Sequence, residues 1–149
     1  MRYNLVLALA VLLAGLMVAC PAADDKKDNK EKKEAKNDKD PLAKFSDEDL
    51  IKIDFCFNKF CEAVAAKDAK TAAAFIAEMP NNLARLDLGK EADKTTFLNA
   101  LAGFAGAELV SSQRMAMGGL GQVTYRDKSG KEKTQRMQNV GGRWKITGL

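Results

Sequence analysis

Few side chains in this sequence are suited to catalysis, and the chain contains no histidine, the group that titrates nearest neutral pH. Asp54 lies among Ile53, Phe55 and Cys56, where burial would raise the pKa of its carboxyl group and make it a candidate general base. Tyr125 is the one phenol beyond the first few residues and a candidate proton donor. The spacing of these two residues indicates no relay of the kind that active sites use. The sequence therefore favours a non-catalytic protein with no cofactor.

Two cysteines, Cys56 and Cys61, are further candidates for chemistry. Exported proteins commonly hold disulfides, but five residues along a helix rise about 7.5 Å, more than the limit of roughly 7 Å between the Cα atoms of a bridged pair. A metal site is not expected, because the two thiols lie on different helix faces and no histidine completes the set. Cys61 falls on an apolar stripe and is predicted to pack in the core. Cys56 falls off this stripe, which leaves a reactive thiol or a dimer contact as alternatives.

A third cysteine, Cys20, ends a segment with the features of an export signal. Basic Arg2 precedes an apolar run over residues 5–17, small residues follow, and the sequence beyond Cys20 is charged. The run Met17-Val18-Ala19-Cys20 resembles a bacterial lipobox, although methionine stands where leucine is usual. The resemblance implies that residues 1–19 are a lipoprotein signal peptide that is removed. It also implies that Cys20 is acylated with palmitate-like chains, in a protein of the bacterial cell envelope that faces the periplasm or the outside.

Other interpretations of this segment lead to different locations. A transmembrane helix needs about twenty apolar residues, and the apolar run is shorter. A signal peptide that is cut without lipidation leaves Cys20 as an ordinary residue and the protein without an anchor. Two or more acyl chains hold a protein stably on a membrane. Lipidation therefore predicts that the lipid bilayer is the first partner of this chain.

After Cys20 the chain becomes almost wholly charged, with acidic residues and lysines mixed as far as Lys44. No aromatic or β-branched residue is present there to bury surface, so residues 20–44 are predicted to be a disordered tether. The formal net charge of the chain is +4, of which Arg2 and the tether each carry about one unit. The remaining charge is too small to indicate binding of nucleic acid.

The first half of the remaining domain, residues 45–149, begins with a long helical pattern. Ser46 followed by three acidic residues predicts a helix N-terminus. Apolar residues then recur every three or four positions as far as Val64, which predicts one amphipathic helix. Asp54 falls off this stripe, as an exposed residue would.

Two shorter helices are predicted after this pattern breaks at Lys67. Asp68 is expected to cap a second helix that runs to Ile76 and that Pro80 ends, with Asn81-Asn82 as a turn. A third helix is expected to start at Asp93 and to end near one of the following glycines.

The second half of the domain predicts four strands, at residues 109–117, 122–126, 133–140 and 143–147. Glycine pairs and one turn sequence, Asp127-Lys128-Ser129-Gly130-Lys131, separate them. Strands joined this tightly must be antiparallel neighbours, so the sheet is predicted to be a meander. Alternation places Trp144 and Ile146 on one face.

The element order predicts an α+β fold with three helices packed on a curved four-stranded antiparallel meander. The stretches from Tyr125 to Lys131 and from Val140 to Ile146 are similar to the closing hairpins of the nuclear-transport-factor-two-like superfamily. The opening helices, from Phe57 to Ala72, also resemble that superfamily. The resemblance implies a cystatin-like, cone-shaped domain over residues 45–149, with a cavity at its open end.

The resemblance alone does not select a function, because the superfamily includes ligand carriers, isomerases, dehydratases and dimerisation modules. The first interpretation is a binding module for a small apolar or amphipathic ligand. Its predicted lining is Phe57, Phe60, Met115, Tyr125 and Trp144. The alternative is an interaction module that pairs with itself or with another envelope protein through a polar sheet face, made by Thr124, Arg126, Arg136, Gln138, Lys145 and Thr147. A hydratase-like or isomerase-like enzyme is the third interpretation.

Overall fold

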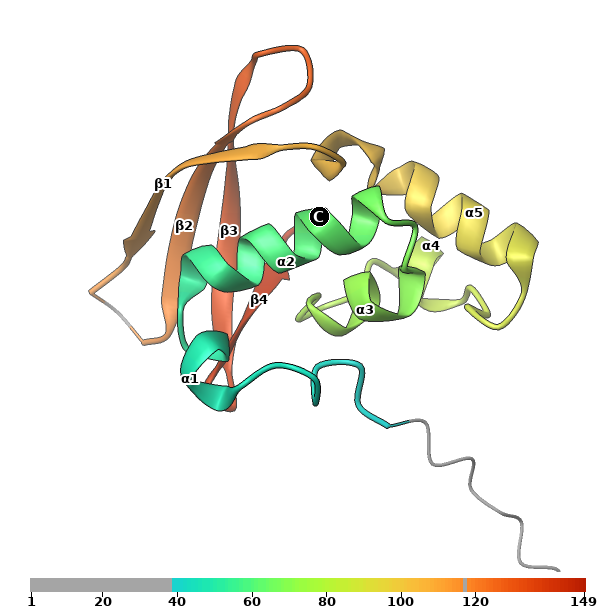
Figure 1. Ribbon diagram of the computed structural model, residues 1–149, viewed down its shortest axis with the longest axis horizontal. Helices are drawn as coiled ribbons and strands as arrows, with labels where there is room; N and C mark the ends of the chain where they lie inside the picture. The colour runs from blue at the N-terminus through green and yellow to red at the C-terminus, as the bar shows by residue number, and fades with distance from the viewer. Residues whose placement is uncertain (1–38, 117) are drawn as a thin grey trace, which may run out of the picture. The chain divides into compact units, whose positions relative to one another are not determined.

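The computed structural model describes residues 39–116 and 118–149 of the chain. The chain divides into two units, residues 1–35 and 36–149, and the described residues all belong to the second. The predicted signal peptide, the acylation site Cys20 and most of the predicted tether lie outside the described residues. Within the described part, five helices and one 3-10 turn precede four strands, an order that confirms the predicted α+β class (Figure 1).

The first predicted helix is two helices. Helix α1 (Asp47–Leu50) ends early, and helix α2 (Ile53–Ala65) follows after a short break. The carbonyl of Ile51, in this break, accepts hydrogen bonds from the side chains of Arg114 and Trp144 at 2.7 and 3.0 Å. The break therefore serves contacts with the sheet, which helical periodicity does not reveal.

The predicted N-caps are confirmed. The Ser46 hydroxyl accepts a hydrogen bond from an N–H in the first turn of α1 at 3.2 Å. The Asp68 carboxylate accepts from the N–H of Thr71 at 3.1 Å and so begins α3 (Ala69–Ala74). Helix α3 ends at Ala74 and not at Ile76 as predicted. The reason is that residues 75–77 form backbone hydrogen bonds with Ile146 of the last strand.

The segment between α3 and the sheet needs two corrections. The predicted turn after Pro80 is the one-turn helix α4 (Asn81–Ala84). The N–H groups of Leu83 and Ala84 donate hydrogen bonds to the carbonyl of Pro80. Helix α5 (Glu91–Ala100) begins before Asp93, whose carboxylate instead accepts from a backbone N–H of the preceding loop at 2.9 Å. A 3-10 turn, η1 (Ala102–Phe104), then leads into the sheet.

The four strands form the predicted antiparallel meander, in the order β1-β2-β3-β4. Strand β1 ends before residue 117 because the N–H of Met115 donates to the carbonyl of Leu120 and closes the hairpin. A bulge at Val110 shifts the register of β1 against β2. At the other edge, the backbone of Ile146 exchanges hydrogen bonds with residues 75–77, which cover that edge. The strands are β1 (Glu108–Arg114), β2 (Leu120–Arg126), β3 (Glu132–Val140) and β4 (Arg143–Thr147).

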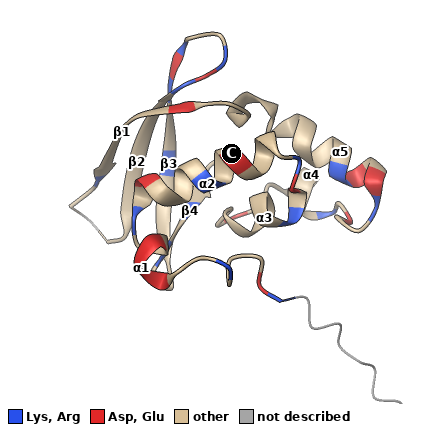
Figure 2. Ribbon diagram, viewed as in Figure 1, with Lys and Arg blue, Asp and Glu red and all other residues tan. Residues whose placement is uncertain are grey.

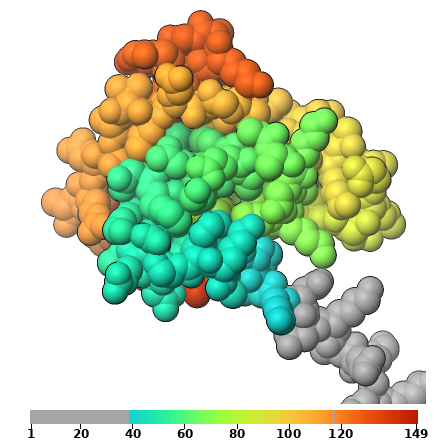
Figure 3. Space-filling model, viewed as in Figure 1, coloured from blue at the N-terminus to red at the C-terminus, as the bar shows by residue number. Residues whose placement is uncertain are grey.

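The helices cover one face of the sheet, here called the helix side, and α2 crosses it in front of the strands (Figures 1 and 3). Val123, Tyr125, Trp144 and Ile146 point to the helix side and are at most 5% exposed. The opposite face is here called the open face, and none of its residues in β2, β3 and β4 is buried. The open face presents Leu120, Gln122, Thr124, Arg126, Thr134, Arg136, Gln138, Val140, Arg143, Lys145 and Thr147.

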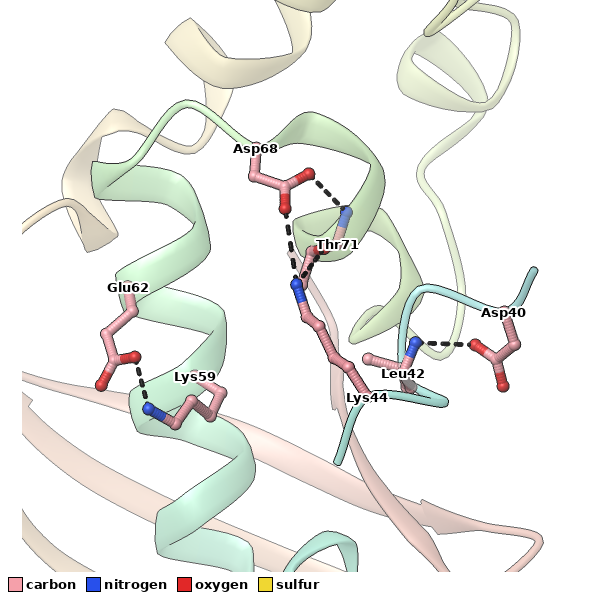
Figure 4. Close-up of polar contacts among 7 residues, drawn as sticks. All are labelled: Asp40, Leu42, Lys44, Lys59, Glu62, Asp68 and Thr71. Carbon is pink, nitrogen blue, oxygen red and sulfur yellow. Dashed lines mark hydrogen bonds and ion pairs between the residues drawn. The ribbon is translucent and has the colours of Figure 1, made fainter. Parts of the chain in front are cut away.

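The folded domain begins before residue 45, so the predicted tether is too long at its end. Leu42 is only 2% exposed and belongs to the core. Its N–H donates to the carboxylate of Asp40 at 2.9 Å, and the ammonium group of Lys44 lies 3.7 Å from Asp68 at the start of α3 (Figure 4). One leucine among many charged residues was too weak a signal of this docking.

Candidate functional site

Four aromatic side chains fill the space between α2 and the sheet. Phe57 and Phe60 of α2 pack against Phe104 of η1, with ring centroids 6.4 and 5.1 Å away. Tyr125 of β2 lies 5.2 Å from Phe57 and 5.4 Å from Phe104. Three of the residues predicted to line a cavity, Phe57, Phe60 and Tyr125, are therefore brought together. They form a packed cluster in which each ring occupies the space beside the next.

The other two predicted lining residues lie elsewhere. Trp144 is 4% exposed, its indole N–H donates to the carbonyl of Ile51, and the guanidinium of Arg114 lies 5.7 Å from its ring. This places Trp144 in the core at the α1–α2 junction. Met115 is 43% exposed and lies at the β1–β2 turn, beside the open face.

The candidate acid and base are not arranged as a catalytic pair. Asp54 is exposed, so the expectation that it is buried among its apolar neighbours is wrong. Asp54 lies on the solvent side of α2 because its position falls outside the apolar stripe of that helix. Tyr125 lies on the helix side of the sheet, where burial raises the pKa of its phenol. The structure does not bring these two residues together.

The two cysteines of the domain are both buried free thiols. Burial raises the pKa of Cys56 to about 11 and that of Cys61 to about 12. The Cys56 thiol donates to the carbonyl of Leu50 at 3.2 Å. A thiol reacts as its thiolate, so the raised pKa of Cys56 argues against a reactive thiol. Because Cys56 is buried, its side chain is also not available for a dimer contact. Cys61 packs in the core as predicted.

An open pocket of about 310 Å³ borders the aromatic cluster at Phe104. Helices α4 and α5 form one wall, and β3 with the last residues of the chain forms another. Its lining combines apolar side chains with the amides of Asn82 and Gln135, and no charged side chain takes part in it. The lining residues are Pro80, Asn82, Leu83, Ala100, Leu101, Phe104, Gln135, Gly148 and Leu149.

Gln135 is the buried polar group of this pocket, with 8% of its surface exposed. Its side-chain N–H₂ donates to the carbonyls of Thr147 at 2.6 Å and of Arg136 at 3.2 Å. These two acceptors fix which end of the amide is nitrogen. No described residue donates a hydrogen bond to Oε1 of Gln135. In the described part of the chain, every fully buried side-chain nitrogen or oxygen has a hydrogen-bond partner. The oxygen is therefore partly exposed, on a residue that lines the pocket and whose amide nitrogen is held by two backbone carbonyls.

Two other hollows lie on the domain. A groove of about 400 Å³ runs over the open face and is bordered by Met115, Leu120 and Arg136. A pocket of about 380 Å³ lies between the C-terminal end of α2 and α5. No three potential metal ligands gather within residues 39–116 and 118–149. In that same part of the chain, no helix has the length and apolar character needed to cross a membrane.

Gln135 is absent from the predicted site residues, although a signal for it is present in the sequence. Gln135 and Met137 are separated by one residue and so share a face of β3, and Met137 is 1% exposed. An amide on the buried face of a strand requires a partner, which marks the position for attention. Leu83 and Leu101, which complete the pocket, are indistinguishable in sequence from ordinary core residues.

Comparisons of this chain with protein-family models, with curated proteins and with solved structures find no match.

Proposed function

We propose that this chain is a membrane-anchored lipoprotein of the bacterial cell envelope whose domain binds a small, uncharged amphipathic ligand. The observation that carries the ligand is the free acceptor of Gln135 in a pocket without charged side chains. Ligand sites are typically apolar cavities with few, well-placed polar groups. We also propose that the helices and meander form the cone of the nuclear-transport-factor-two-like superfamily, a proposal supported by the element order.

The pocket itself defines the chemistry of the ligand. A charged ligand would lose part of its hydration without an ion pair from a side chain, because no charged side chain lines the pocket. The Oε1 of Gln135 only accepts hydrogen bonds, so it selects a hydroxyl or N–H donor. A volume of about 310 Å³ suits a ligand at the small end of the usual range. The ligand is therefore small, neutral and mostly apolar, with one donor group.

Binding without catalysis follows from the same lining. None of its side chains titrates, and Asp54 and Tyr125 do not border it. The pocket offers neither a general base nor a nucleophile in reach of a bound molecule.

The ligand proposal is tested with N-phenyl-1-naphthylamine, a neutral apolar probe with one N–H donor. Emission of the directly excited probe should rise with the parent chain. Ala100→Trp places an indole at the exposed rim of the pocket and should reduce probe affinity at least tenfold. Ala92→Trp, at an exposed position of the same helix outside the pocket, is the matched control and should bind like the parent. Equal binding by both variants, or none by the parent, contradicts the proposal.

The anchoring proposal is tested separately at Cys20. Cys20→Ala should release the protein from the membrane fraction or leave the precursor uncut. The mass of the mature N-terminus should show acyl chains on the parent. An unchanged distribution together with a mature N-terminus that carries no acyl mass would show that the segment is an ordinary signal. The pocket test does not depend on this result.

A further inference from the structure

Two cations on the open face, Arg136 and Lys145, form no ion pair among the described residues. In the sheet register, Arg136 lies between Gln122 and Thr147, and Lys145 lies opposite Gln138. Arg136 and Lys145 are thus diagonal neighbours on adjacent strands, roughly 7–8 Å apart. Like charges so placed repel each other, and a bound anion stabilises both.

The carboxylates of the domain lie away from this pair or are already bound. On the open face, Glu108 and Glu132 lie at the far end of the sheet, and Glu132 pairs with Arg126 at 2.9 Å. Asp40 acts on Lys145 electrostatically but is held by Arg143 at 2.7 Å. Helix α1 is acidic (Figure 2), and its Asp47 likewise pairs with the guanidinium of Arg143, at 3.5 Å.

Exposed apolar side chains lie next to the two cations. Met115, Leu120 and Val140 are 43%, 42% and 43% exposed, and they flank the β1–β2 and β3–β4 turns at one end of the sheet. Leu120 lies opposite Gln138, two pairs away from Arg136 and on the same face. Met115, Leu120 and Arg136 border the same groove of about 400 Å³. We call Met115, Leu120, Arg136, Val140 and Lys145 the docking patch.

We propose that the docking patch binds the surface of an anionic lipid bilayer. Cations near an anionic leaflet gain attraction to its headgroups, and apolar side chains beside them enter the boundary between headgroups and acyl chains. A soluble acidic partner would satisfy Arg136 and Lys145 but gives no reason for three exposed apolar side chains at the turns. The Arg143–Asp40 bond also places the start of the folded domain at this end of the sheet.

This inference rests on the proposed anchor for its membrane setting, and Asp40, one of the first described residues, is bonded to Arg143 at the same end of the sheet. Its chemistry is independent of acylation. The core of the described residues lies between Leu42 and Ile146, so a chain without the signal and Cys20 keeps its core. Residues 21–149 therefore test the patch alone, and a failed acylation test leaves this result untouched.

The experiment is co-sedimentation of residues 21–149 with vesicles of phosphatidylcholine alone, or of phosphatidylcholine with one third phosphatidylglycerol. The parent should bind only the anionic vesicles, and salt should weaken binding. The double variant Arg136→Gln with Lys145→Gln should lose roughly thirtyfold in affinity, since each cation near the surface contributes about a fivefold factor. Leu120→Ser should also weaken binding.

The matched control is Lys59→Gln with Lys94→Gln, which removes the same charge from two helices on the helix side. It should bind as the parent does, and thermal melts should show that all variants are folded. Absent binding to anionic vesicles, equal binding to both vesicle types, or equal loss in the control overturns the proposal. So does binding of soluble polyglutamate in place of vesicles, which assigns the patch to an acidic protein, or a dimer in solution that covers it.

Discussion

The two faces of the sheet differ although the same strands build them. Along β4, Trp144 and Ile146 are at most 4% exposed on the helix side, while Lys145 and Thr147 alternate with them on the open face. On the helix side, aromatic rings pack against one another under α2. On the open face, none of the residues of β2, β3 and β4 is buried, and most of them are polar.

This difference separates stability from binding. The packed rings of the helix side contribute burial energy, and both proposed binding sites lie where this packing ends. The pocket lies at the margin of the aromatic cluster, where Gln135 interrupts the apolar surface. The docking patch lies on the opposite face altogether. Changes to the packed core of the helix side should therefore affect unfolding, and changes in the docking patch should affect binding only.

The largest effect is expected from Trp144→Ala. This change removes a buried ring and the indole donor to the Ile51 carbonyl, and comparable truncations cost about 3–5 kcal/mol. That is a large part of the roughly 5–15 kcal/mol that stabilises a typical domain. The variant should unfold near ambient temperature in thermal denaturation followed by circular dichroism.

Lys145→Ala is the matched change on the other face of the same strand and should leave the melting temperature nearly unchanged. Trp144 is also the sole tryptophan. Its native emission should be blue-shifted and poorly quenched by iodide. A stable Trp144→Ala variant, or red-shifted emission that iodide quenches easily, would contradict the burial of Trp144 and the proposed difference between the two faces.

A smaller effect is expected from Gly121→Ala, which tests how closely the helix side is packed. A Cβ at this position would lie 2.5 Å from Cδ1 of Ile53 and 3.0 Å from the ring of Trp144. Overpacking of this kind costs about 1–3 kcal/mol. Urea denaturation should show that loss. Gln122→Ala, the next residue and on the open face, should change the free energy of unfolding by less than about 0.5 kcal/mol.

The sequence predicted most of the sheet because turns and alternation are local signals. The glycine pairs and the Asp127 turn set the order of the strands, and alternation placed Trp144 and Ile146 on one face. The break in the first helix could not be predicted in this way. It depends on hydrogen bonds from Arg114 and Trp144 to the Ile51 carbonyl, and those residues are far away in sequence.

The candidate site was harder to predict than the fold. Large apolar side chains such as Phe57 and Phe60 are equally suited to line a cavity or to fill it. Their packing against Phe104 decides between these outcomes, and that contact is not local. Gln135 was recognisable in principle from its place beside Met137, but its free oxygen depends on two carbonyls, one of them in β4.

The smallest effect is expected at Lys67, at the end of α2, and should stabilise the domain. Lys67 has a φ of 60°, and it is followed by the hydrogen bond from Asp68 N–H to the Ala63 carbonyl that closes a helix in the Schellman manner. A lysine in this conformation costs roughly 1–2 kcal/mol, whereas glycine adopts it freely but loses about 0.4–1 kcal/mol through its freer unfolded chain. Lys67→Gly should therefore gain roughly 0.5–1 kcal/mol in urea denaturation.

Lys67→Ala removes the same charge but keeps the unfavourable backbone conformation, so it should bring no gain. Both variants should bind the neutral probe and anionic vesicles as the parent does, because Lys67 borders neither the Gln135 pocket nor the docking patch. An equal gain from alanine would mean that charge, and not backbone conformation, sets the cost at this position. A change in vesicle binding would mean that the helix side and the open face are coupled, although their packing separates them.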